Sequence, residues 1–249
     1  TSTSRLVSSP AFISWLSKPF RPDRTPRSHL QRDLTVFVAC LDMEGVLTPE
    51  IWVGLAKRTG IEALCRTTRD EPNYDVLMRY RFSVLRENGL GFEDLRSVAA
   101  SLDPLAGACE FVDWLHGRCQ VTVLSDTFYE LAQPLVAKLG HPMLMCHHLT
   151  FDNVGALDGY RLRQVDPKRQ AVQAFQTLNF RTVAVGDSYN DTAMLRQADT
   201  GILFRAPEIV RSEFPHFPAH EDYDGLKAEI EKALRDDEAA ASLARTGTE

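Results

Sequence analysis

Short apolar runs recur along this chain and alternate with longer amphipathic segments. The first run, 36–41, is unbroken, rich in β-branched residues and bounded by polar residues, as expected for a strand buried on both faces. Similar runs follow at 121–124, 143–145, 182–185 and 201–204. Strands that alternate with helices form a parallel sheet with right-handed crossovers. The pattern therefore predicts an α/β fold with a doubly wound parallel sheet.

The segment 49–103, after the first strand, is too long for a simple crossover loop. It is mostly helical in pattern, with a first helix at 49–59 that has Pro49 at its first position and Glu50 in its first turn. We therefore expect a small helical cap inserted after the first strand. The core is then formed by 35–48 and 104–235.

The pattern also places the smaller elements of the segment 49–103 and of the core. Helices are predicted over 75–87, 92–102, 108–116, 129–139 and 226–234, with further helices starting at 166 and 188. A hairpin is predicted over 149–163, with its turn at Asp158-Gly159. We expect the tail 236–249 to be frayed.

Residues 1–34 differ from the rest, since they are rich in Arg, Ser and Thr, poor in acids and interrupted by prolines. Prolines break long helices, so this segment is predicted to be a disordered extension. Its composition also fits an organelle targeting segment, and that alternative stays open.

Composition excludes several classes of protein. The net charge of −6 and the pI near 5.7 argue against nucleic-acid binding, which needs a basic surface. No apolar run approaches the length of a membrane span, so no membrane interaction is expected. The cysteines are odd in number and form no CxxC pair, which favours reduced thiols in a cytoplasmic protein.

Polar clusters follow three of the predicted strands. They are Asp42 with Glu44, Ser125 with Asp126, and Asp187 with Asp191, and Lys168 precedes the fourth strand. Carboxyl ends of parallel strands share one edge of a sheet, so these groups can converge in one crevice. The first cluster alone also fits an ordinary turn, since Asp and Gly favour turns.

Together these groups predict phosphoryl chemistry. Several carboxylates around a crevice repel each other unless a cation lies between them, and oxygen-only ligands favour Mg²⁺. Lys168 and Ser125 supply donors for phosphoryl oxygens. Asp42 is the candidate nucleophile that forms an aspartyl-phosphate, and Glu44 is placed to protonate the leaving oxygen and later deprotonate water.

The motifs at 42–46 (DMEGV), 124–126 (LSD), Lys168 and 186–191 (GDSYND) stand in the order of the haloacid dehalogenase superfamily motifs. The longer stretches 40–52, 124–129, 166–170 and 186–191 resemble the bacterial phosphoserine phosphatases with homoserine phosphotransferase activity. The resemblance covers about 36–230. It implies a Mg²⁺-dependent phosphatase for O-phospho-L-serine that can also transfer the phosphoryl group to homoserine, and it suggests a homodimer.

The resemblance also implies residue roles. Asp42 resembles the phosphorylated nucleophile and Glu44 the acid/base residue, whose backbone carbonyl would bind Mg²⁺ together with Asp42 and Asp187. Asp191 would hold a metal-bound water or Lys168. The remaining predicted contacts are Ser125 and Lys168 with phosphoryl oxygens, Asp126 and Asn190 near the phosphate, Glu50 with the substrate ammonium and Arg81 with its carboxylate.

One position departs from the wider superfamily, because the acid/base residue is usually Asp and here is Glu44. Its longer side chain moves the proton carrier by about one methylene. We hypothesise that this alters the partition between hydrolysis and transfer to an alcohol.

Simpler structural roles stand beside these functional ones. Arg81 also fits a solvated helix face and Glu50 a first-turn charge. His147-His148 lacks a third ligand at metal-site spacing, so strand-end histidines without a role are favoured there.

Two alternative functions remain at this stage. One is a phosphatase of the same fold acting on another small phosphomonoester, such as a sugar phosphate. The other is a non-enzymatic receiver-like module phosphorylated on an Asp. The span 49–103 and Glu44 argue against a receiver.

Overall fold

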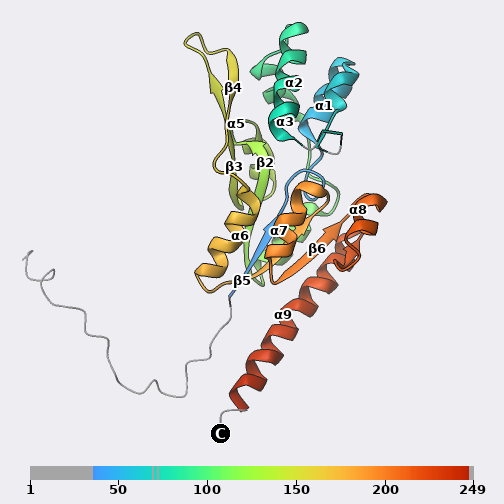
Figure 1. Ribbon diagram of the computed structural model, residues 1–249, viewed down its shortest axis with the longest axis vertical. Coiled ribbons are helices and arrows are strands. Elements are labelled where there is room, and N and C mark those ends of the chain that lie inside the picture. Colours follow the sequence, from blue (N-terminus) through green and yellow to red (C-terminus); the bar gives the residue numbers. More distant parts are fainter. Residues whose placement is uncertain (1–35, 69, 72, 247–249) are drawn as a thin grey trace, which may run out of the picture. The chain divides into compact units, whose positions relative to one another are not determined.

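The computed structural model describes residues 36–68, 70, 71 and 73–246, with side chains described up to residue 236 (Figure 1). The predicted extension, or targeting segment, at 1–34 lies outside the described residues, as does the end of the tail, 247–249. No helix in the described ranges combines the length and apolar character that a membrane crossing requires.

Among the described residues, one sheet contains seven strands in the order β4-β3-β2-β1-β5-β6-β7. In chain order they are β1 (Phe37–Leu41), β2 (Gln120–Phe128), β3 (Met143–Phe151), β4 (Leu157–Arg161), β5 (Arg181–Gly186), β6 (Thr200–Phe204) and β7 (Ala219–His220). The pairings are parallel except that of β3 with β4, which is antiparallel. The predicted, mostly parallel sheet is confirmed, with the 36–41 run at its centre.

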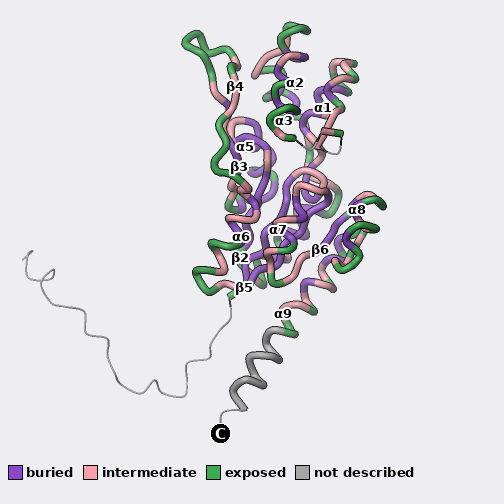
Figure 2. Tube along the Cα trace, viewed as in Figure 1, coloured by how far each residue is buried: buried purple, intermediate pink, exposed green. Residues whose placement is uncertain are grey.

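Helices cover both faces of this sheet, as the doubly wound prediction requires. They are α1 (Ile51–Thr59), α2 (Tyr74–Glu87), α3 (Phe92–Ser101), α4 (Ala108–His116), α5 (Tyr129–Lys138), α6 (Pro167–Thr177), α7 (Thr192–Gln197), α8 (Glu208–Glu213) and α9 (Tyr223–Thr246), with 3₁₀ helices at Glu62–Cys65 and Tyr189–Asp191. Successive side chains of β1 point to opposite faces. Ala39 and Leu41 pack in a core with α4, α5 and α9, whereas Val38 and Cys40 pack with α6, α7 and α8. Figure 2 shows the buried residues running through the sheet between these layers.

The helices α1–α3 stand beside the β3–β4 hairpin (Figure 1). The rings of Phe92 and Phe151 meet edge to face at 5.0 Å, and α3 also packs against α5. Helix α1 begins at Ile51 and not at Pro49, because Glu50 keeps an extended backbone (φ −67°, ψ 123°) as the N-cap. That the segment 49–103 acts as a cap stays a prediction.

Several element boundaries differ from those predicted. The prediction of a turn at Asp158-Gly159 is wrong, because Gly159 lies within β4 opposite Thr150. The chain turns at 152–156 instead, where the Asp152 carboxylate accepts hydrogen bonds of 2.9 Å from the backbone N–H groups of Val154 and Ala156. Helix α9 continues to Thr246, well beyond 234, and α8 and β7 were not predicted.

The loop after β1 is fixed from several sides. The backbone N–H of Asp42 bonds Val185 of β5 (2.9 Å), and the Tyr223 hydroxyl of α9 donates to the carbonyl of Val46 (2.7 Å). Gly45 has φ +87°, a conformation that glycine adopts without strain. A Cβ at Gly45 would lie 2.4 Å from an oxygen of Asp187, so this glycine lets the two loops approach closely.

Candidate active site

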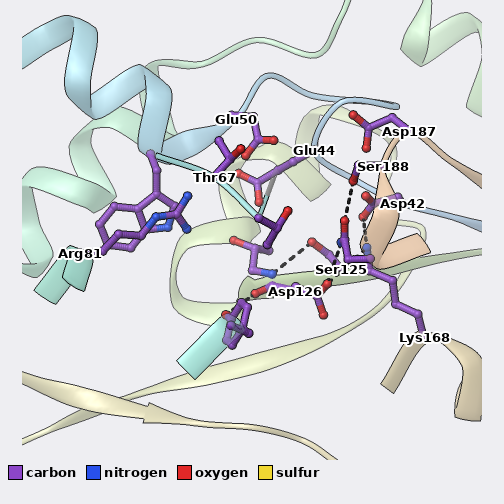
Figure 3. Close-up of a pocket in the computed structure, with 15 residues that line it drawn as sticks. Asp42, Glu44, Glu50, Thr67, Arg81, Ser125, Asp126, Lys168, Asp187 and Ser188 are labelled. Carbon is purple, nitrogen blue, oxygen red and sulfur yellow. Dashed lines mark hydrogen bonds and ion pairs between the residues drawn. The ribbon is translucent and has the colours of Figure 1, made fainter. Parts of the chain in front are cut away.

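One pocket lies beyond the carboxyl ends of the central strands (Figure 3). Strand β1 pairs with β2 on one side and β5 on the other, so the last residues of β2, which runs to Phe128, meet the loops that follow β1 and β5. The pocket is lined by every predicted site residue except Asp191, which is fully buried beside it: Asp42, Glu44, Glu50, Arg81, Ser125, Asp126, Lys168, Asp187 and Asn190. The predicted convergence is therefore what the structure contains, whereas the role of each residue stays a prediction.

Asp42 is buried at the start of the loop after β1. Its Oδ1 accepts a hydrogen bond from the backbone N–H of Met43 (2.7 Å) and lies 2.8 Å from Lys168 Nζ. Burial and the nearby carboxylates of Asp191 and Asp187 raise the pKa of Asp42 well above its ordinary value, against the opposing effect of Lys168. Its orientation is thus fixed through one oxygen by two donors.

Lys168 is the electrostatic centre of the pocket. It lies in the first turn of α6, where the helix dipole disfavours a cation. Three carboxylates offset this unfavourable interaction with the dipole, since Lys168 Nζ lies 2.7 Å from Asp191, 2.8 Å from Asp42 and 3.5 Å from Asp126. Burial alone would lower the pKa of Lys168, but these three carboxylates raise it well above its ordinary value, so the ammonium stays charged.

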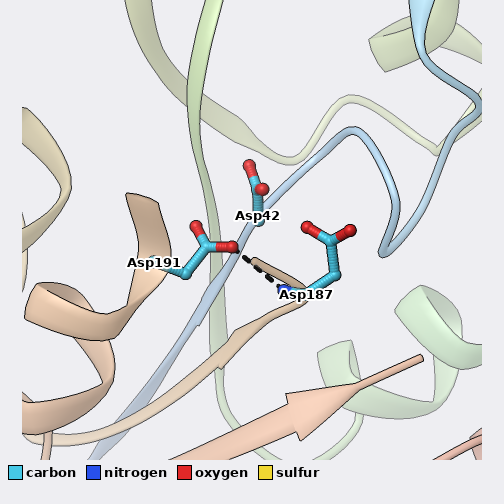
Figure 4. A group of neighbouring side chains, drawn as sticks. All are labelled: Asp42, Asp187 and Asp191. Carbon is cyan, nitrogen blue, oxygen red and sulfur yellow. Dashed lines mark hydrogen bonds between the residues drawn. The ribbon is translucent and has the colours of Figure 1, made fainter. Parts of the chain in front are cut away.

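Asp42, Asp187 and Asp191 form a buried cluster in which one oxygen of each lies within 4.8 Å of the others (Figure 4). Hard oxygen donors around a small space suit Mg²⁺. Asp191 differs from the other two, because its Oδ2 accepts from the backbone N–H groups of Asp187 (2.9 Å) and Ser188 (3.1 Å) and its Oδ1 binds Lys168. The three carboxylates fit a divalent cation, and both oxygens of Asp191 already accept hydrogen bonds.

Glu44 is half-buried on the side of the pocket that faces α1. Its Oε1 accepts a hydrogen bond of 2.7 Å from the backbone N–H of Ile51, so the start of α1 orients the carboxyl group. Burial and the charge of Glu50 raise the pKa of Glu44 to about 8. A partly protonated carboxyl group at neutral pH suits proton transfer.

Arg81 and Glu50 carry opposite charges on the side of the pocket formed by α1 and α2. The Arg81 guanidinium is buried over the Trp52 ring, 4.7 Å from its centre, and Nη2 donates to the carbonyl of Arg66 (2.9 Å). Burial lowers the pKa of Arg81, against the opposing effect of Glu44 and Glu50. Within the described ranges its Nε has no hydrogen-bond partner. The simpler prediction from the sequence, that Arg81 lies on a solvated helix face, is therefore wrong, because its side chain is buried.

Ser125, Asp126 and Asn190 complete the pocket. The backbone N–H of Thr127 donates to Ser125 Oγ (3.2 Å), and Asn190 Nδ2 donates to Asp126 Oδ2 (3.0 Å). Burial alone would raise the pKa of Asp126, but Lys168 and hydrogen bonds from His147 and Asn190 hold it well below its usual range. Asp126 is thus a stable anion at the edge of the pocket.

Six further lining residues were not predicted as site residues from the sequence: Trp52, Thr67, Thr68, Tyr74, Thr127 and Ser188. Ser188 lies inside the 186–191 motif, so its position there could have identified it. Tyr74 donates from its hydroxyl to the backbone carbonyl of Asp126 (2.6 Å), a contact across 52 positions that no local pattern indicates.

The fold and this site define the class of protein. The chain belongs to the haloacid dehalogenase-like hydrolase family, whose model matches residues 38–199. Two relatives are more specific. The phosphoserine phosphatase ThrH of Pseudomonas aeruginosa is 58% identical over 196 residues, which cover 79% of this chain and 96% of that protein. A phosphoserine phosphatase of Pseudomonas syringae pv. tomato is 56% identical over 201 residues, 81% of this chain and 85% of that protein.

A solved structure supports the fold. A substrate-bound phosphoserine phosphatase complex superposes with a TM-score of 0.64 at 22% identity and covers 78% of this chain and 97% of that one. At this level of identity the likeness concerns the fold, which agrees with the predicted haloacid dehalogenase-like architecture.

Proposed function

We propose that this protein hydrolyses O-phospho-L-serine to L-serine and phosphate through an aspartyl-phosphate on Asp42. The observation that carries the proposal is the arrangement of charges in one pocket. The Asp42–Lys168 pair suits a phosphoryl group, and Arg81 and Glu50 on the opposite side suit the carboxylate and ammonium of an amino acid. The names of two relatives more than 50% identical to the chain support the same substrate.

The chemistry proceeds in two displacements. A carboxylate oxygen of Asp42 attacks phosphorus, the bond from phosphorus to the serine oxygen breaks, and the Glu44 carboxyl group gives its proton to that oxygen. Water then attacks the aspartyl-phosphate, Glu44 accepts a proton from the water, and the bond between Asp42 and phosphorus breaks to release phosphate. Lys168 and Ser125 hold the phosphoryl oxygens during both steps.

Asp42, Asp187 and the backbone carbonyl of Glu44 would hold Mg²⁺, with Asp191 supporting them through Lys168. When bound, the ion neutralises charge on the phosphoryl oxygens and on the carboxylates around them. The segment 49–103 would act as a cap, because it supplies Glu50 and Arg81 and its helices border the pocket, so water can be excluded once substrate is bound.

Product analysis tests this proposal. The protein is incubated with phosphoserine and Mg²⁺, with and without homoserine, and serine, phosphate and phosphohomoserine are quantified. A panel of sugar phosphates and other small phosphomonoesters is assayed in parallel. Faster turnover of another ester would overturn the substrate, and an aspartyl-phosphate that persists for minutes would favour the receiver-like alternative.

The Arg81→Ala variant is expected to lose kcat/KM for phosphoserine by roughly 10- to 100-fold, because a charge-assisted contact to the substrate carboxylate is removed. Turnover of p-nitrophenyl phosphate, which has no carboxylate, should change by less than about threefold. The matched control is Arg79→Ala, an exposed arginine on the same helix. Equal losses for both substrates would show that Arg81 supports the fold and not substrate selection.

We further propose that homoserine can replace water as the acceptor, which would give phosphohomoserine. The proposal is supported by the Glu44 side chain, which is longer than the usual Asp and is oriented by the Ile51 N–H, because a longer proton acceptor would extend further toward an attacking alcohol. The homodimer suggested by the resemblance stays a prediction.

The Glu44→Asp variant tests the acceptor proposal. We expect the ratio of phosphohomoserine to free phosphate to fall by roughly threefold or more, because the shorter side chain withdraws the proton acceptor from the larger nucleophile. Both products are measured in one reaction by ³¹P NMR. An unchanged ratio would count against a role for Glu44 in the choice of acceptor.

A further inference from the structure

His147 is buried in the middle of β3 (Met143–Phe151), and its two ring nitrogens face different groups. Its Nδ1 accepts a hydrogen bond from the backbone N–H of Arg163 (3.2 Å), so Nδ1 carries no proton. The imidazole is therefore the neutral tautomer with its proton on Nε2. That Nε2 lies 3.5 Å from Asp126 Oδ1, a long polar contact to the carboxylate.

Asp126 connects His147 to residues that line the pocket. Its other oxygen, Oδ2, accepts from Asn190 (3.0 Å) and lies 3.5 Å from Lys168 Nζ. Lys168 in turn lies 2.8 Å from Asp42. With one oxygen held by His147, the carboxylate presents the other to Asn190 and Lys168, which sit beside the reacting group.

Tyr74 holds the same residue from the α2 side. Its hydroxyl donates to the backbone carbonyl of Asp126 (2.6 Å), and its ring packs edge to face on His147 with 5.9 Å between ring centres. Rotation of the Asp126 side chain away from Lys168 would have to break the contact with His147. The imidazole itself is kept in place by Arg163 and Tyr74.

We propose that His147 is a positioning residue, which orients Asp126 through its Nε2 proton so that Lys168 and Asn190 are aimed at the phosphoryl group. The site would then contain a chain of polar contacts from His147 through Asp126 to Lys168 and Asp42. The inference deepens the proposed function and rests on it for the identity of the reaction.

Two substitutions separate this role from a structural one. His147→Gln can place an N–H near the Nε2 position and retain the contact with Asp126, but it loses the acceptor for Arg163. His147→Asn retains an acceptor near Nδ1 but cannot reach Asp126. We expect His147→Asn to lower kcat for phosphoserine by about tenfold or more and His147→Gln by less than about threefold. The opposite order, or equal losses, would overturn the proposal.

A double-mutant cycle with Asp126→Asn adds a second criterion. If His147 acts only through Asp126, then His147→Asn should change kcat by less than about twofold in the Asp126→Asn background. If the loss of kcat in the double variant equals the product of the losses in the two single variants, His147 acts independently of Asp126, which contradicts the proposal.

Two readouts do not need phosphoserine turnover. Orthophosphate affinity, measured calorimetrically with Mg²⁺, should weaken in His147→Asn and not in His147→Gln. In the wild-type protein, ¹⁵N NMR of labelled histidine should show a buried neutral imidazole protonated on Nε2, and protonation on Nδ1 would overturn the proposal. If wild-type protein fails to release phosphate from phosphoserine, the proposed function fails while these two readouts still decide the role of His147.

Discussion

The Asp42→Asn variant is expected to release phosphate from O-phospho-L-serine more slowly than wild type by a factor on the order of 10⁴ or more. An amide oxygen is a poor nucleophile, so the aspartyl-phosphate cannot form. Asparagine keeps the shape of the side chain and an oxygen for the Met43 N–H, which lies 2.7 Å from Asp42 Oδ1. The pocket should therefore stay intact around a centre that cannot react.

Three measurements check this expectation. Phosphate release is followed with Mg²⁺ present, thermal unfolding shows that the variant is folded, and mass spectrometry of trapped protein looks for a phosphoryl adduct on the peptide that contains residue 42. Asp158→Asn, a change at an exposed position in β4, is the matched control and should behave as wild type. Full activity in Asp42→Asn would overturn the proposed mechanism.

The Lys168→Met variant is expected to lose both activity and stability. Methionine has a similar length but no charge, so the carboxylates of Asp42 and Asp191, at 2.8 and 2.7 Å, lose their cation while they stay buried. Removing one partner of a buried ion pair costs about 3–5 kcal/mol, so the free energy of unfolding should fall by about that amount. Phosphatase activity should fall by roughly 10³-fold, since the phosphoryl oxygens lose a charged donor.

Urea unfolding and the rate of phosphate release test the two effects separately. The matched control is Arg169→Met at the next position, whose partly exposed side chain pairs with Asp166 outside the pocket. That substitution should cost less than about 1 kcal/mol and leave the rate unchanged. If Lys168→Met were as stable and as active as the Arg169→Met control, the proposed roles of Lys168 in stabilising the buried carboxylates and in binding the phosphoryl group would be contradicted.

The sequence alone indicated the sheet and the position of its acids. The run 36–41, the later strand segments and the alternation with helices are local patterns, and local patterns record which side chains must be buried. The order of Asp42, Lys168 and Asp187 along the chain could be assigned to one edge of the sheet because parallel strands end at the same side. For the same reason the convergence of these residues was predicted without coordinates.

Local patterns were less reliable where two choices of similar free energy compete. Asp158-Gly159 fits a hairpin turn, yet the Asp152 carboxylate satisfies two backbone N–H groups at 152–156 and fixes the turn there. Helix α1 begins after Pro49 because Glu50 stays extended, and β7 is too short to leave a pattern in the sequence.

Only the tertiary structure decided how the pocket is completed. Tyr74 contacts Asp126, which is 52 positions away in the chain, and the contact of His147 with Asp126 depends on the register of β3 against β2, in which His147 pairs with Phe128. Such contacts join side chains from separate elements, so they depend on packing and not on the residues next to them in the chain. The sequence thus determined which chemistry is available at the sheet edge, whereas packing determined which neutral side chains hold it in place.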